Sequence, residues 1–133
     1  MNLTIHNHLL SKQFLSNMAY NTTHNILAAI VDATDTIAFY HFHPQHHTIQ
    51  EIFQGTSKPS GKKTSLAWSH DGQYLALGSG QLELWKFDGK KLIPLKNYTE
   101  DFIDIKIIVW SPDSFSIAYG GLCKKNTVKI RQL

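Results

Sequence analysis

The stretch from Thr64 to Phe87 constrains the fold more than any other part of the chain. It contains three short apolar runs, separated by a Ser-His-Asp-Gly segment at residues 69–72 and a Gly-Ser-Gly segment at residues 78–80. Short apolar runs bounded by such turn residues are typical of antiparallel strands joined in a meander. No helical periodicity of useful length occurs anywhere in the sequence, so the pattern predicts an all-β chain.

Two other parts of the chain repeat this stretch. The triplet Leu66-Ala67-Trp68 recurs as Ile108-Val109-Trp110 and, in a weaker form, as Met18-Ala19-Tyr20. Seven residues after each aromatic residue comes an aliphatic residue followed by alanine, at Leu27-Ala28, Leu75-Ala76 and Ile117-Ala118. A meander that recurs at a fixed period indicates a repeat architecture.

The repeated meander resembles a repeat of the WD-repeat β-propeller family, over residues 14–133. The spacing from Trp68 to Trp110 lies within the ~40–45 residues typical of that family, and the spacing from Tyr20 to Trp68 is slightly longer. The resemblance implies β-propeller blades made of four-stranded antiparallel meanders, about three in number, at residues 14–54, 63–96 and 102–133, with an N-terminal strand at 3–9. It also implies that four aromatic residues anchor the blade cores: Tyr20, Trp68, Trp85 and Trp110.

The sequence departs from the family pattern at several positions. Many WD-repeats carry a Gly-His pair before the first strand and an Asp after the terminal Trp, and these residues support a hydrogen-bonded tetrad. Here no Gly-His pair occurs, Lys86 follows Trp85, and Arg131 stands where the third terminal Trp is expected. We therefore expect that the tetrad is not assembled.

An incomplete propeller needs a partner for its open faces. Propellers close with typically four to eight blades, and three blades leave faces and strand edges uncovered. We expect either that missing chain segments complete the ring or that two copies associate. In the second case a six-bladed homodimer would form if residues 3–9 of one copy paired with residues 127–133 of the other.

Composition excludes several other classes of protein. With 133 residues, 42% hydrophobic and 17% charged, the chain has the size and composition of one globular domain. No apolar run approaches the roughly 18 residues of a membrane span, and the N-terminus lacks the regions of a signal peptide. We expect a cytoplasmic or nuclear protein without membrane contact. The single cysteine, Cys123, excludes an internal disulfide and a zinc site built on cysteines.

The basic residues suggest a binding surface. The net charge of +3 and the pI near 9.0 are mild. In a propeller, however, the predicted connectors would bring five lysines to one side: Lys58, Lys62, Lys63, Lys124 and Lys125. Such a patch would favour encounter with an acidic protein partner or a phosphate backbone. The alternative, ordinary solubilising lysines, carries about equal weight.

The histidines invite a metal hypothesis, because neutral imidazole is a common metal ligand. Propeller topology would place five of them on the opposite side: His24, His43, His46, His47 and His70. No Cys or Glu completes a recognisable ligand spacing, so solvated turns are the favoured interpretation and no metal site is predicted.

No catalytic constellation or cofactor motif is predicted. Ser69, His70 and Asp71 are adjacent in a tight turn, whereas the members of a triad converge from separate segments. The segment from Gly55 to Thr64 superficially resembles a phosphate loop, but its glycine spacing is wrong and a second Lys precedes Thr64. The favoured function is a non-enzymatic scaffold for protein–protein interaction within a multi-protein complex. The alternative is a nucleic-acid-binding module that uses the basic loops, and a propeller enzyme ranks third.

Overall fold

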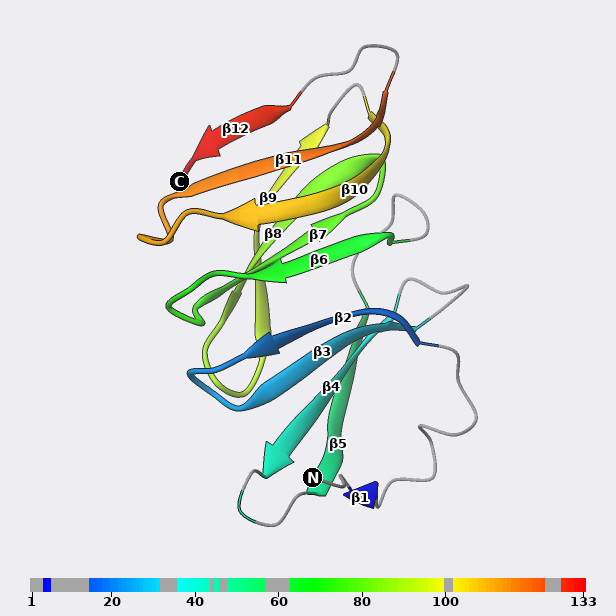
Figure 1. Ribbon diagram of the computed structural model, residues 1–133, viewed down its shortest axis with the longest axis vertical. Coiled ribbons are helices and arrows are strands. Elements are labelled where there is room, and N and C mark those ends of the chain that lie inside the picture. The colour runs from blue at the N-terminus through cyan, green and yellow to red at the C-terminus, as the bar shows by residue number, and fades with distance from the viewer. Residues whose placement is uncertain are drawn as a thin grey trace.

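A computed structural model describes residues 4–5, 15–31, 36–43, 45, 48–56, 63–99, 102–123 and 128–133. The chain is all-β and forms three sheets that are stacked in the order of the sequence (Figure 1). Within the described residues, no helix has the length and apolar character needed to cross a membrane.

Each sheet is an antiparallel meander of consecutive strands. The first contains β2 (Leu15–Asn21), β3 (Ile26–Val31), β4 (Thr36–His43) and β5 (Thr48–Thr56). The second contains β6 (Ser65–Trp68), β7 (Tyr74–Gly78), β8 (Gln81–Phe87) and β9 (Leu92–Thr99). The third contains β10 (Phe102–Trp110), β11 (Ser116–Cys123) and β12 (Lys129–Gln132).

The N-terminal strand belongs to the first sheet. The described part of the predicted strand at residues 3–9 is β1 (Thr4–Ile5), which pairs in parallel with β5 of the same chain. The pairing hypothesised between residues 3–9 and the last strand of another copy is therefore not the one that the structure contains.

The three sheets share one register. Val109 pairs with Ala118 in the third sheet, as Ala19 pairs with Ala28 in the first and Ala67 with Ala76 in the second. Repeat-equivalent residues therefore occupy equivalent places, and of the three described sheets only the second has another sheet packed on each of its faces.

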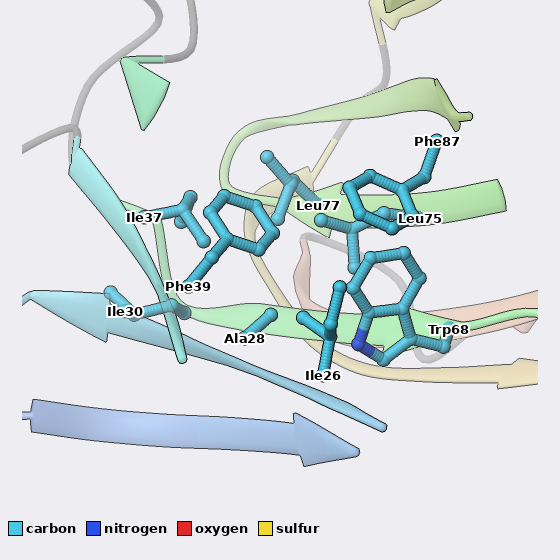
Figure 2. Packing of buried hydrophobic residues seen from close by; sticks show 9 residues of the cluster. All are labelled: Ile26, Ala28, Ile30, Ile37, Phe39, Trp68, Leu75, Leu77 and Phe87. Carbon is cyan, nitrogen blue, oxygen red and sulfur yellow. The ribbon is translucent and has the colours of Figure 1, made fainter. Parts of the chain in front are cut away.

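The interface between the first and second sheets is a mixed aliphatic and aromatic core (Figure 2). Phe39 of β4 stacks on Phe87 of β8 with ring centroids 6.4 Å apart, and Trp68 meets Phe87 edge-on at 5.3 Å. Ala28 in the middle strand β3 is fully buried. The small alanine lets the large rings of the second sheet approach, and burial of each large side chain contributes about 1.5–3 kcal/mol.

The interface between the second and third sheets repeats this plan with different residues. Trp110 stacks on Tyr74 with ring centroids 6.0 Å apart, and Leu84 and Ile105 are buried between the sheets. Arg131 occupies the repeat position of Trp85, and its guanidinium carbon Cζ lies 4.2 Å from the ring centroid of Tyr98. Its Nε donates a hydrogen bond of 2.9 Å to the hydroxyl of Tyr119.

The turns that open the second and third meanders are chemically the same. The Ser69 hydroxyl donates to Asp71 Oδ1 at 2.6 Å, and the amide of Tyr74 donates to Ser69 Oγ at 2.9 Å. Ser111 and Asp113 make the matching bonds in the third sheet, and the two donors to Asp113 lower the pKa of its carboxyl group. Ser69, His70 and Asp71 thus form the predicted turn.

Candidate interaction surface

Indole hydrogen bonds link the first strands of successive sheets. Trp68 Nε1 donates to the carbonyl oxygen of Ala19 at 3.1 Å, and Trp110 Nε1 donates to that of Ala67 at 3.0 Å. Trp68 is 9% exposed and Trp110 is 4% exposed, so the predicted burial of both is confirmed. Each tryptophan therefore reaches across to the sheet before its own and fixes the register between the two sheets.

The other two predicted anchors differ. Tyr20 is 40% exposed, because its face of the first sheet points away from the second sheet, so its predicted role as a core anchor is wrong. Its hydroxyl donates to Asn25 Oδ1 at 2.8 Å. Trp85 is half-buried at the margin of the first interface. In the described part of the chain its buried Nε1 has no hydrogen-bond acceptor.

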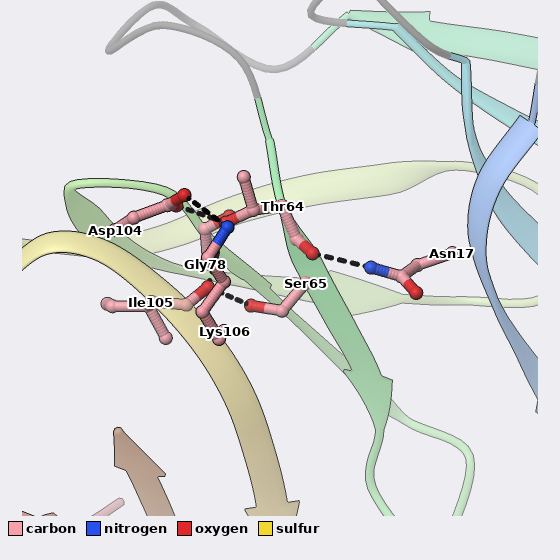
Figure 3. A network of polar contacts seen from close by, with 7 residues as sticks. All are labelled: Asn17, Thr64, Ser65, Gly78, Asp104, Ile105 and Lys106. Carbon is pink, nitrogen blue, oxygen red and sulfur yellow. Dashed lines mark hydrogen bonds and ion pairs between the residues drawn. The ribbon is translucent and has the colours of Figure 1, made fainter. Parts of the chain in front are cut away.

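Polar contacts also join the first strands of the three sheets, β2, β6 and β10, near the N-terminal end of β6 (Figure 3). Asn17 Nδ2 donates to the carbonyl oxygen of Thr64 at 2.5 Å. The hydroxyl of Ser65 donates to the carbonyl oxygen of Ile105 at 2.7 Å. The Thr64 hydroxyl lies within hydrogen-bond distance of Asp104 Oδ1, and Lys106 Nζ lies 2.8 Å from Asp104 Oδ2.

Close approach of the strands explains a glycine in this network. A Cβ placed on Gly78 would lie 2.2 Å from Ser65 Oγ and 2.9 Å from Ile105 Cγ2. Sequence reasoning did not identify this network, because its members are single polar residues in three strands that meet only after folding.

Lys63, predicted to belong to an exposed basic patch, lies inside the protein. It is 1% exposed, and its Nζ forms an ion pair with Glu83 Oε2 of β8, which is 3% exposed. The prediction is wrong for this residue because Lys63 lies two residues before β6, where its side chain is buried within the sheet stack and meets Glu83. Burial of both charges is tolerated because they are paired.

The other four lysines of the predicted patch, Lys58, Lys62, Lys124 and Lys125, fall outside the described residues. The patch that they were predicted to form stays a prediction.

The histidines do not converge on a metal site within the described residues. His41 and His43 lie next to each other on β4 with ring centroids 4.2 Å apart, and burial together with His43 lowers the pKa of His41. His24 packs edge-on against Phe87 at 5.3 Å. In the described part of the chain no three metal-ligating side chains come together, and His46 and His47 lie outside it.

One large apolar surface remains exposed, on the face of the third sheet that points away from the second. We call it the open face. It carries five aliphatic side chains from β10, β11, β12 and the residue before β12, and each is 56–72% exposed: Ile107, Val109, Leu122, Val128 and Ile130. The neighbouring Ile103 is 70% exposed. Sequence analysis did not single out this face, although the continuous apolar run at 107–110 is the signal of a strand segment covered on both sides.

Solved structures share this arrangement of stacked meanders. The chain aligns with a chain of the mitotic checkpoint complex at a TM-score of 0.65 and 22% identity, over 80% of this chain and 31% of the other. It aligns with a proposed 6-phosphogluconolactonase from Bacteroides uniformis at 0.78 and 16% identity, over 99% of this chain and 41% of the other. The periplasmic gluconolactonase of Pseudomonas aeruginosa aligns at 0.75 and 15% identity, over 91% and 37%.

The fold is that of part of a β-propeller. The chain spans about a third to two fifths of the propeller chains that it matches. No protein-family model matches the sequence, and a search of curated proteins found no relative. At these identities the likeness shows the fold alone, so the three sheets are propeller blades whose function must be argued from their surfaces.

Proposed function

We propose that this chain is a non-enzymatic scaffold of the WD-repeat type, which binds protein within a multi-protein assembly through its open face. The observation that carries the proposal is the exposure of five clustered aliphatic side chains on the third blade. Ile130 is 71% exposed, whereas its repeat equivalents Phe39 and Leu84 are 0% and 2% exposed under the next blade. The open face thus has the composition of a covered surface.

The size of the open face supports a role in association. Its five aliphatic side chains are each more than half exposed and lie on neighbouring strands, so they form a contiguous apolar patch of the kind that marks an interaction site. Surfaces of that extent mark interaction sites for proteins or apolar ligands. The protein class is favoured because a flat, three-stranded sheet face matches another sheet better than it encloses a small molecule.

The polar groups between the blades support a structural rather than a chemical role. Asp104 contacts Thr64 and Lys106, and Lys63 pairs with Glu83. These charged groups connect one blade or strand to another, and they are engaged in holding the inner strands together. Two of the matched solved structures carry lactonase names and one belongs to a checkpoint assembly, so the comparisons favour neither an enzyme nor a scaffold.

A capture experiment tests the proposal. The tagged chain is incubated with cell extract, and the proteins bound to the wild type are compared with those bound to Ile130→Lys. Met18→Lys is the matched control, because Met18 is also an exposed apolar residue, at 59%, but lies on the first blade. We expect Ile130→Lys to lose at least one protein that wild type and Met18→Lys retain. Equal capture by all three would contradict the assignment of the open face.

The basic loops provide a second test. Replacing Lys62, Lys124 and Lys125 together by Glu reverses most of the predicted patch while leaving the buried Lys63 in place. If this variant loses an acidic partner while Ile130→Lys keeps it, the binding surface is the basic loops. Binding to RNA or DNA that falls steeply with salt would favour the nucleic-acid alternative.

A further inference from the structure

We draw no further inference here: the strongest candidate, the pair of facing imidazoles of His41 and His43 on β4, has no third metal-ligating side chain beside it in the described part of the chain and would otherwise rest on the lowered pKa of His41 alone.

Discussion

The second and third blades use the same register and similar residues, yet they differ in how they are covered. The second blade lies between two others, so Leu75 and Leu77 on one face and Leu82 and Leu84 on the other are at most 2% exposed. The third blade is covered on one face only: Ile117 is 1% exposed, and Ile130, in the next strand, is 71% exposed. The difference shows that the neighbouring sheet, rather than residue type, decides whether a blade residue is core.

The hydrogen bonds of the tryptophans show the same dependence on a neighbouring blade. Trp68 and Trp110 each have a preceding blade whose alanine carbonyl accepts the indole N–H. Tyr20, at the same repeat position, faces away from the second blade and bonds within its own hairpin instead. The anchoring role therefore needs both an indole N–H and a preceding blade whose carbonyl oxygen accepts it.

The largest expected effect is on a tryptophan between two blades. Trp110→Ala removes a buried ring and its hydrogen bond to Ala67, so we expect the free energy of unfolding to fall by about 4–5 kcal/mol. Urea denaturation followed by circular dichroism measures it. The control is Phe115→Ala, because Phe115 is equally aromatic but 66% exposed, and should change the free energy by less than about 0.5 kcal/mol. Equal effects at the two positions would mean that the second interface is not a packed core.

A slightly smaller effect is expected at the buried ion pair in the doubly covered blade. Lys63→Met leaves the carboxylate of Glu83 without its ion-pair partner in the interior, which we expect to cost about 3 kcal/mol. Lys63→Met combined with Glu83→Leu should be less destabilised than Lys63→Met alone, because the double variant removes the buried charge of Glu83 together with that of Lys63. Glu83→Leu alone completes the comparison. If the double variant loses as much unfolding free energy as the two single variants added together, the pair is not coupled.

The repeated meander was predictable because it depends on local signals. Apolar runs and Ser-x-Asp turns determine strands and turns within one blade, and the recurrence of Leu66-Ala67-Trp68 aligned the blades correctly. These features involve residues close in sequence, and they led to the propeller fold that the structure contains.

The contacts between blades were not predictable in the same way. The burial of Lys63 depends on Glu83 in another strand, and the exposure of Tyr20 depends on which sheet lies next to it. The first depends on how strands of the second blade pack together, and the second depends on which blades are neighbours; one sequence contains neither. The open face was not predicted, because aliphatic residues such as Val109 are of the type found in cores and are exposed here only because no sheet covers them.

A moderate effect is expected where the turns of neighbouring blades meet. Asn21 is 1% exposed, and its Nδ2 donates to the carbonyl oxygen of Gly72 at 2.9 Å. Its Oδ1 accepts from the amides of Thr23 and His24 at 3.0 and 3.1 Å. Asn21→Ala leaves these groups unsatisfied and should cost about 1–3 kcal/mol.

Two features make this substitution informative about the link between blades. Gly72 has a φ of +75°, and a Cβ there would lie 2.6 Å from Asn21 Oδ1, so the two turns fit closely. Asn17→Ala is the control, because Asn17 is exposed and also donates to a backbone carbonyl of the second blade. If the exposed Asn17 matters as much as Asn21, burial is not what makes the turn contact strong.

The smallest expected effect on the isolated chain comes from the residue that matters most for association. Ile130 is 71% exposed, so Ile130→Lys should change the unfolding free energy of a dilute sample by no more than about 0.5 kcal/mol. Leu84→Lys, at the repeat-equivalent covered position, buries a charge at a site that is 2% exposed and should destabilise the chain far more than Ile130→Lys. Association changes this expectation in a defined way, because a partner that binds only the folded chain raises the apparent stability by mass action. The melting temperature of the wild type should therefore rise when a protein captured from cell extract is added, and that of Ile130→Lys should stay constant. A captured protein that raises both melting temperatures equally would mean that it binds outside the open face, and that the uncovered side of the third blade plays no part in its recognition.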